Sequence, residues 1–357
     1  MKKMKIFLYC LVCMILVSSC FFVSNKETSS NNNILDEENS ITNGNLIENS
    51  FNRLIVRAAI NNTECNVAID TGGNDLGSII MDSAFFYTHV DTCELVNSID
   101  YNNRDHRLLY AGYYTGKISL CIGGDTIYAE KIIIFKNKFS HFKYKDSSNF
   151  VAIIGKLYFD KVMSVNFDEN KLVLADSLFF DTSDYTPIEM YPPRKIETIE
   201  NDNHDNKNEK HIEIGGFIDS KGNEIKGRFL FDTGSYKSLI LETEFGKKLK
   251  IPKNYDIYKD PREEEEAMWI WYANSLNFGD LKIDSVHIEQ TLLQITPGHS
   301  WFMDSHSDGI LGMDLIKRFN FIADFKNNVI YLKPNKFYYN VNTNTLNDLY
   351  LKRLNKL

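Results

Sequence analysis

The amino-acid sequence predicts a mostly β protein made of two homologous lobes in one chain. Asp-Thr-Gly occurs twice, each time at the end of an apolar run, and two further motifs recur with it in the same order. The repeated motifs are Asp-Thr-Gly at 70–72 and 232–234, a strand end with glycine at 120–124 and 276–280, and an apolar pair before glycine at 153–155 and 310–312. Self-similarity of this kind indicates one structural unit present twice.

Each Asp-Thr-Gly is predicted to follow a β-hairpin. Segments with alternating apolar residues flank a polar turn before each copy, which is typical of two antiparallel strands. The segments are 51–60, the turn 61–64 and 65–69 in the first lobe, and 212–218, the turn 219–223 and 225–231 in the second. A short apolar strand follows each motif, at 78–81 and 238–241. Each hairpin therefore delivers an acidic residue to a loop.

Strands also dominate the rest of the chain. They are expected at 117–122, 126–135, 172–174 and 329–332. The expected helices are short: two start just after the glycine motifs, at 157–162 and 315–319, and an amphipathic helix is expected at 345–357. Tyr191 and the two prolines after it open a stretch rich in Asn, Asp, Lys and Glu, which is the best boundary between lobes.

The first residues are predicted to be a targeting signal rather than part of the folded protein. Three lysines precede an apolar run at 6–17, as in a secretory signal. Residues 16–20 resemble the lipobox of bacterial lipoproteins, in which the signal is removed and the cysteine, here Cys20, becomes the lipidated first residue. An uncleaved membrane anchor is the alternative, because apolar character continues to Val23. Both interpretations place the body of the protein outside the cytoplasm, and the first attaches it to the bacterial cell envelope through a lipid.

These features define the predicted domains. We expect a lipoprotein signal peptide at 1–20, a flexible tether at 21–50, an N-terminal lobe at 51–190, a polar linker at 191–210, a C-terminal lobe at 211–337, and a tail that can form a helix at 338–357. With 357 residues and 43% hydrophobic residues, the chain is long enough for two cores.

Charge and cysteine usage exclude several classes of function. The net charge of −8 leaves no basic surface for nucleic acid. Cys65, Cys93 and Cys121 remain after removal of the signal and acylation of Cys20, so these three can form at most one disulfide, whose pairing the sequence leaves open. Their spacing does not resemble a metal site, and we expect no metal and no cofactor.

The two aspartates, Asp70 and Asp232, suggest a specific chemistry. Two adjacent carboxyl groups cannot both ionise cheaply, so the pair holds one proton and can act as base and acid at once. Gly72 and Gly234 lack a Cβ and would let the two loops approach closely. Thr71 and Thr233 could hold the loops in register through their hydroxyl groups. Water activated between the carboxyls would then hydrolyse a substrate without a metal.

Taken together, these motifs resemble those of the retropepsin-like and pepsin-like aspartic peptidases. The resemblance covers roughly 51–180 and 211–335, and the lipobox makes the chain similar to bacterial retropepsin-like lipoproteins. It implies two retropepsin-like acid-protease lobes in a pseudo-twofold, bilobal barrel arrangement, and a monomer with an internal pseudo-dimer. It makes Asp70 and Asp232 the catalytic pair. The scaffold of the active site would be Thr71, Gly72, Thr233, Gly234 and Ser235.

The first lobe departs from the family pattern at two places: after its Asp-Thr-Gly motif, and at Lys156, which follows the glycine of 153–155 where the second lobe has Met313. Gly73 follows the first motif where the family usually has Ser or Ala, whereas Ser235 fits the family. A hydrogen bond from the Ser235 hydroxyl would favour ionised Asp232 and leave the shared proton on Asp70. The flaps that cover substrate in this family are expected at 108–114 and 268–272, with the substrate-binding candidates Tyr110, Tyr113, Trp269 and Trp271. We interpret the tryptophans as core or flap residues rather than a sugar-binding platform.

The resemblance therefore implies an aspartic endopeptidase that binds a peptide or protein substrate in an extended conformation. The alternative is a catalytically inactive peptide- or protein-binding module of the cell envelope, which Gly73 and the uncertain flaps motivate. The sequence does not indicate the substrate.

Overall fold

A computed structural model of the chain describes residues 44–47, 53–72, 79–91, 110–114, 116–129, 132–135, 150–155, 160–191, 213–250, 256–259, 267–291 and 307–339. The chain divides into two units, Met1–Asn43 and Gly44–Leu357, and all the described elements belong to the second. The predicted signal peptide, Cys20 and most of the tether lie outside the described residues. We call 44–191 the first half and 213–339 the second half.

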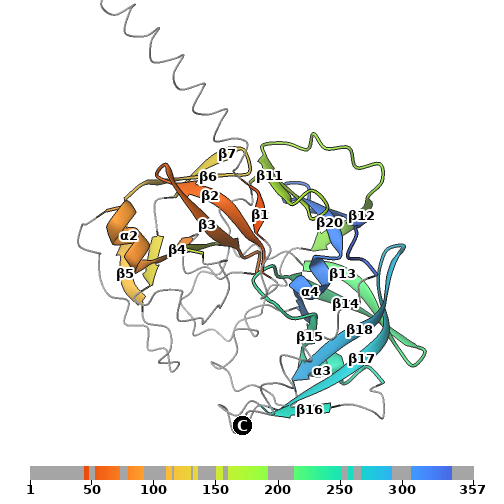
Figure 1. The fold of residues 1–357 in the computed structure, drawn as a ribbon. Helices are drawn as coiled ribbons and strands as arrows, with labels where there is room; N and C mark the ends of the chain where they lie inside the picture. The colour runs from red at the N-terminus through yellow and green to blue at the C-terminus, as the bar shows by residue number, and fades with distance from the viewer. Residues whose placement is uncertain are drawn as a thin grey trace, which may run out of the picture. The chain divides into compact units, whose positions relative to one another are not determined.

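The mostly β fold is confirmed (Figure 1). The first sheet is a half-barrel with strand order β5-β8-β4-β9-β3-β2-β6-β7 and β1 paired to β2. Its strands are β1 (Leu46–Ile47), β2 (Ile55–Ile60), β3 (Thr63–Ile69), β4 (Ile79–Asp82), β5 (Tyr110–Tyr114), β6 (Ile118–Ile122), β7 (Asp125–Ala129), β8 (Ile132–Phe135) and β9 (Ala152–Ile154).

The second sheet has the order β11-β10-β20-β21-β12-β13-β14-β19-β15-β18-β17-β16. A further pairing between β13 and β17 closes a barrel. The strands are β10 (Val162–Asn166), β11 (Lys171–Ala175), β12 (Thr186–Tyr191), β13 (Glu213–Ser220), β14 (Asn223–Phe231), β15 (Leu239–Leu241), β16 (Asp256–Lys259), β17 (Ala267–Phe278), β18 (Leu281–Thr291), β19 (Gly309–Leu311), β20 (Phe319–Asp324) and β21 (Val329–Pro334). The first half thus contributes β10, β11 and β12 to this sheet.

The same strand pairings occur around both Asp-Thr-Gly motifs. In the first half, β9 runs parallel to β3 and antiparallel to β4, and β4 runs parallel to β8. In the second half, β19 runs parallel to β14 and antiparallel to β15, and β15 runs parallel to β18. The repeated motifs of an apolar pair before glycine, at 153–155 and 310–312, lie at the ends of β9 and β19. Repetition in sequence therefore corresponds to repetition of the local topology.

The two halves also join through antiparallel strands β10 and β20. Each strand leads into a hairpin whose turn contains an asparagine in the left-handed region, Asn170 or Asn328, both with φ of 54°. When the two turns are matched, Ser164 and Ile322 occupy equivalent positions, and these two residues are paired with each other across the joint. The joint therefore pairs a position of the first half with its own counterpart in the second.

Both predicted hairpins are confirmed. The β2–β3 turn uses Asn61 and Asn62, and the β13–β14 turn uses Lys221 and Gly222, all with positive φ. Asparagine and glycine suit this backbone region because they tolerate positive φ better than most residues. One predicted strand was wrong in extent, because 126–135 contains two strands, β7 and β8.

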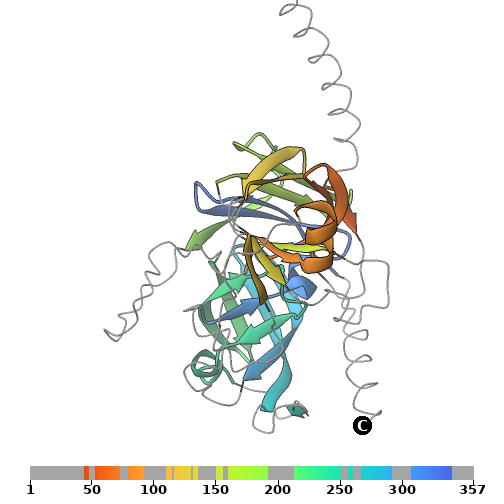
Figure 2. The same cartoon turned by 90° about the vertical axis from the view of Figure 1, so that its left-hand side faces the viewer.

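The helices differ most from the prediction. Helix α4 is Met313–Ile316 and Phe319 already begins β20, so the expected helix at 315–319 starts too late; Val162 begins β10 rather than ending a helix. Helices α2 (Ser83–His89) and α3 (Thr243–Gly246) were not predicted. Figure 2 shows α2 in orange next to β4, which it contacts. The Asp82 carboxylate caps α2 by accepting the N–H of Ala84 at 2.8 Å. The expected helix at 345–357 lies outside the described residues.

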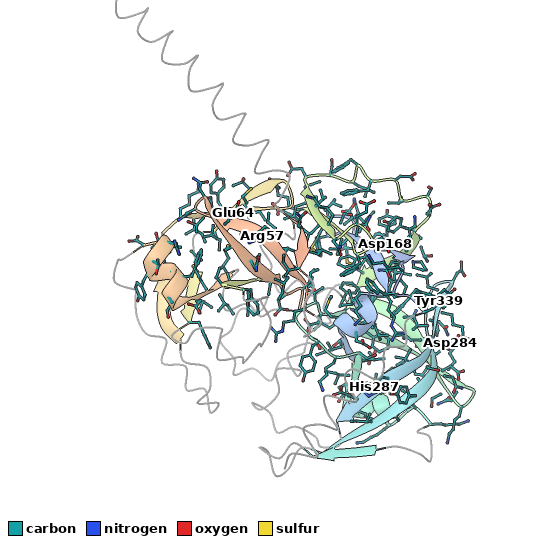
Figure 3. All side chains as sticks on the ribbon, in the orientation of Figure 1. Arg57, Glu64, Asp168, Asp284, His287 and Tyr339 are labelled. Carbon is teal, nitrogen blue, oxygen red and sulfur yellow. The ribbon has the colours of Figure 1, made fainter. Side chains whose placement is uncertain are left out.

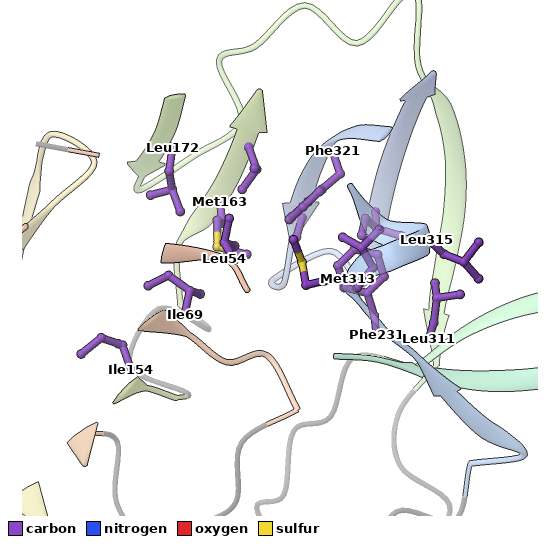
Figure 4. Packing of buried hydrophobic residues seen from close by; sticks show 14 of the residues in the cluster. Leu54, Ile69, Ile154, Met163, Leu172, Phe231, Leu311, Met313, Leu315 and Phe321 are labelled. Carbon is purple, nitrogen blue, oxygen red and sulfur yellow. The ribbon is translucent and has the colours of Figure 1, made fainter. Parts of the chain in front are cut away.

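The hydrophobic core is continuous between the halves. Figure 4 shows Ile69 and Ile154 of the first half, Met163 and Phe321 of the joint, and Phe231 of the second half in this cluster.

Smaller clusters lie on the opposite face of the strands that end at the aspartates. Two rows of residues cross this face in matching register: the first row is Ile55, Ala68, Ile153, Ile80 and Ile133, and the second row is Glu213, Leu230, Ile310, Ile240 and Glu289.

Cysteine placement limits the disulfide that the sequence left open. Cys65 is a free, buried thiol, and burial raises its pKa to about 12. It pairs with Ala58 of β2, whereas Cys121 pairs with the next residue, Ala59. Successive residues of a strand point to opposite faces, so Cys65 and Cys121 cannot be bridged. Cys93 lies outside the described residues.

None of the helices in the described ranges has the length and apolar character needed to cross a membrane.

Candidate active site

Each Asp-Thr-Gly loop begins at the end of a central strand: β3, which lies between β2 and β9, or β14, which lies between β13 and β19. The N–H of Asp70 donates to the carbonyl oxygen of Ile154 at 2.9 Å, and the N–H of Asp232 donates to that of Leu311 at 2.9 Å. Both acids therefore leave a buried strand at the same register relative to the glycine motif. Both residues are half-buried.

The threonines bind the two loops to each other. The Thr233 hydroxyl oxygen accepts the N–H of Thr71 at 3.0 Å, and the Thr71 hydroxyl oxygen accepts the N–H of Thr233 at 3.0 Å. Each hydroxyl also donates to a carbonyl of the opposite loop: Thr233 to Ile69 at 2.7 Å, and Thr71 to Phe231. Both threonines are fully buried. This reciprocal set of four hydrogen bonds fixes the two loops in register across the interface.

The glycines allow the close approach that the sequence suggested. A Cβ on Gly72 would lie 2.4 Å from Cγ of Asp232, and a Cβ on Gly234 would lie 2.4 Å from Cγ of Asp70. These distances are far below van der Waals contact, so alanine at either position would displace the opposite carboxyl group. Each glycine therefore makes room for the acid of the other loop.

The electrostatics of the pair favour one shared proton. Burial and, next, the neighbouring charge of Asp70 raise the pKa of Asp232 well above its ordinary range. A hydrogen bond between the two carboxyl groups acts in the same direction. The N–H groups of Gly234, at 2.8 Å, and Ser235, at 3.1 Å, oppose this rise by donating to Asp232 Oδ1. The N–H of Gly72 donates to Asp70 Oδ1 at 3.1 Å.

The expected role of the Ser235 hydroxyl was wrong. Its oxygen accepts the N–H of Lys237 at 3.4 Å, and it is the main-chain N–H of Ser235 that binds Asp232. The raised pKa of Asp232 favours its protonated form, and our expectation that the shared proton rests on Asp70 stays a prediction. Desolvation outweighs the two main-chain donors here. Gly73 lies outside the described residues.

The flap candidates lie on strands that border the two rows. Tyr110 and Tyr113 belong to β5 and Trp269 to β17, but their side chains lie outside the described part of the structure. The expectation that Trp271 binds substrate was wrong, because its side chain is 1% exposed and packs in the main core. Alternation along β17 turns Ile270 and Tyr272 to the other face instead, and Tyr272 is 38% exposed.

Sequence reasoning missed two buried ion pairs in the second half. Lys237 Nζ lies 2.6 Å from Glu289 Oε2, and an Arg228 guanidinium nitrogen lies 2.7 Å from Glu213 Oε2. Glu213 lies at an alternating position of the predicted strand 212–218, whereas none of the strand ranges predicted from the sequence includes Glu289. Glu289 and Glu213 both belong to the second row, and the matching residues of the first row are Ile133 and Ile55.

No group of three or more His, Cys, Asp or Glu residues that could hold a metal ion gathers in the described ranges. No family model and no curated protein matches the chain. The geometry of the two loops is therefore the main basis for a functional conclusion.

Proposed function

We propose that the protein is an aspartic endopeptidase that hydrolyses peptide bonds with a water activated between Asp70 and Asp232. We also propose that its halves are retropepsin-like lobes related by a pseudo-twofold axis. The matching strand pairings around the two motifs and the self-matching register of β10 with β20 support this relationship.

The observation that carries the proposal is the reciprocal bonding of the two Asp-Thr-Gly loops. Four buried hydrogen bonds through Thr71 and Thr233 join segments far apart in the sequence. Two glycines without which the loops would collide complete the arrangement. A turn that only ends a strand would not require a second, matched turn packed against it. The arrangement brings the carboxyl groups of two half-buried residues into hydrogen-bond contact.

We propose different roles for the two acids, with the shared proton on Asp232, the carboxyl group whose pKa is raised. Asp70, as the ionised partner, accepts a proton from the attacking water, while protonated Asp232 donates a hydrogen bond to the oxygen of the scissile carbonyl. Water oxygen then bonds to the carbonyl carbon. On collapse of the tetrahedral intermediate, the carbon–nitrogen bond breaks and the proton held by Asp70 moves to the leaving amine. The main-chain donors of Gly234 and Ser235 keep the carboxyl of Asp232 oriented throughout.

The test is cleavage of a diverse peptide mixture by the purified full-length protein between about pH 4 and 8. This range covers the pH at which a pair of carboxyl groups holds one proton. Asp70→Asn and Asp232→Asn should each lower the cleavage rate about 10²–10⁴-fold. Addition of a statine-type transition-state mimic should inhibit the unaltered protein.

The matched control is Asp284→Asn, which makes the same chemical change at an exposed side chain on β18 (Figure 3). Cleavage should be unchanged in this variant. Activity retained by either active-site variant would refute the mechanism. Tight binding of the mimic without any cleavage would support the alternative, a peptide-binding module that does not cut.

We also propose that the protein is exported and held at the cell envelope by a lipid on Cys20, as the lipobox-like residues 16–20 indicate. Mass spectrometry of the N-terminal peptide from the producing cell would detect the acyl chains. Cys20→Ala should release the protein from the membrane fraction, and retention of that variant in the membrane would favour the uncleaved anchor.

A further inference from the structure

The side chains next to the two aspartates can be identified from strand alternation and register. Ala68 lies two residues before Asp70, and Leu230 two residues before Asp232, so each shares a sheet face with its acid. The paired strands extend this face through the first and second rows defined above. The main core lies on the other face, where Ile69 and Phe231 point. A chain lying along the aspartates would thus face the first row with one part and the second row with another.

The two rows differ in chemistry at matching positions. The first row is aliphatic throughout, and Ile80 and Ile153 in it are partly exposed. The second row keeps three apolar residues at its centre but has a glutamate at each end. Both oxygens of Glu213 are shielded from solvent, which closes that pair to a ligand. Glu289 is therefore the residue that makes the second row different for a bound chain.

Glu289 is connected to the active-site loop through Lys237. Lys237 lies in the segment between Asp232 and β15, and its carbonyl oxygen accepts the N–H of Asp314 at the start of α4, at 3.1 Å. Its ammonium group binds Glu289 Oε2, and both side chains are at most 10% exposed. His287 lies on the same face of β18, with its ring 5.4 Å from that of Tyr272 (Figure 3). The polar end of the second row is therefore attached to the loop that carries the acid.

The charge balance of this pair indicates what it can bind. Lys237 already neutralises the carboxylate, so a second cation would add an unbalanced charge in a poorly hydrated place. The bond to Lys237 is the only hydrogen bond that the Glu289 side chain makes within the described residues, and it uses one of the two carboxylate oxygens. A carboxylate can accept further hydrogen bonds. A neutral group with an N–H or O–H fits Oε1 without changing the net charge.

We infer that the two sides of the scissile bond are recognised by unlike surfaces. The first row binds an apolar side chain. The second row binds a neutral side chain that donates a hydrogen bond to Glu289, such as a carboxamide or hydroxyl. This inference rests on the proposed peptidase function and specifies its substrate class.

The probes are statine-centred peptides in which one flanking residue is either glutamine or methionine. These two side chains have similar length, but only glutamine donates a hydrogen bond. Dissociation constants of the full-length protein should favour glutamine about tenfold on one side of the statine only, because an apolar group would leave the acceptor unpaired. Lysine at that position should bind more weakly than glutamine.

The key variant is the double substitution Lys237→Met with Glu289→Ile, which replaces the ion pair by apolar groups and leaves no buried charge alone. It should abolish the glutamine preference. The double substitution Lys282→Met with Asp284→Ile, at the exposed ion pair on the same strand β18, is the control and should leave that preference intact. If the double variant fails to fold in a melting experiment, Glu289→Gln serves instead and should reduce the preference several-fold, because a neutral acceptor binds a donor less strongly.

The outcomes separate the inference from the proposed function. Binding and cleavage with equal preference on both sides, or a preference that survives the double variant, would overturn the inference alone. The one-sided preference without any cleavage would overturn the peptidase and uphold the recognition of the donor. Absence of both binding and cleavage would overturn the two together.

Discussion

The first half surrounds its aspartate with Ala68, Ile153 and Ile133, whereas the second half places Leu230, Ile310 and Glu289 at the same registers. The loops that carry the acids differ far less, since each has the same threonine, the same glycine and the same main-chain bond to its neighbouring strand. The comparison teaches that the halves are alike where the two carboxyl groups meet and unlike on the surface that we propose distinguishes the two parts of a bound chain.

The sheets differ in a related way. In the second half, β17 is one continuous strand that pairs with both β13 and β18 and so closes the barrel. In the first half, the corresponding pairings are divided between β5, which pairs with β8, and β6, which pairs with β2. A divided strand leaves the first sheet as a half-barrel. Closure of the barrel is therefore not required to hold an acid loop in place.

The largest effect should come from the glycines, where we expect the halves to behave alike. Gly72→Ala and Gly234→Ala would each place a methyl group against the opposite carboxyl. Activity should fall at least about 10²-fold in both, because displacing a reacting group by about 1 Å costs that much. Peptide cleavage by the two variants is the measurement. Gly222→Ala is the control for loss of a glycine: its Cβ would meet nothing, and the backbone strain at its φ of 71°, which costs about 1 kcal/mol of stability, should leave cleavage unchanged. Normal activity in only one active-site variant would break the equivalence of the loops.

The threonines should come next, with an effect on stability. Thr71→Val or Thr233→Val removes a hydroxyl that accepts one buried N–H and donates to one buried carbonyl. Each should lower the free energy of unfolding by about 2–4 kcal/mol, measured by denaturant titration. Thr→Ser at either position keeps the hydroxyl group and should retain most of the free energy of unfolding. Unequal costs in the two valine variants would show that one half depends on the interface more than the other.

The titration of Asp232 sharpens the comparison between the acids. Its folded pKa is raised, so ionised Asp232 costs stability, and this cost is absent below the unfolded pKa of about 3.9 and grows as the pH rises to the folded value. Asp232→Asn should therefore stabilise the protein by about 1–2 kcal/mol at pH 8. The gain should vanish near pH 3.5. Melting temperatures of both proteins across this range test the sign, and a variant destabilised at pH 8 would contradict it.

The smallest effect concerns the two hairpins at the joint. Asn170→Ala and Asn328→Ala put a residue that disfavours positive φ at the turns after β10 and β20. Each should cost about 0.5–1 kcal/mol, and Asn→Gly should cost less. Thermal melting of the four variants provides the measurement. A loss of stability in one alanine variant but not in the other would argue against the equivalence of the two hairpins.

Prediction from sequence succeeded where the signal is local. Alternation and turn residues identified the hairpins that end at Asp70 and Asp232, and the repeated motifs located β9 and β19. Prediction failed where tertiary contacts decide. Helix α2 is rich in aromatic residues that favour strands, and its start is fixed by the Asp82 cap. Likewise, only the register of β17 shows that Trp271 faces the core, and only the fold brings Lys237 to Glu289.

The register of β10 with β20 has a consequence for the origin of the chain. Two identical subunits related by a twofold axis can join antiparallel strands only around a point where a position faces its own copy. The pairing of Ser164 with Ile322 satisfies that condition within a single polypeptide. If the halves are the pseudo-twofold lobes proposed above, a half-length precursor would assemble with a copy of itself through this seam. Fusion of two such genes would then have freed each copy to acquire its own surface while the seam stayed the same.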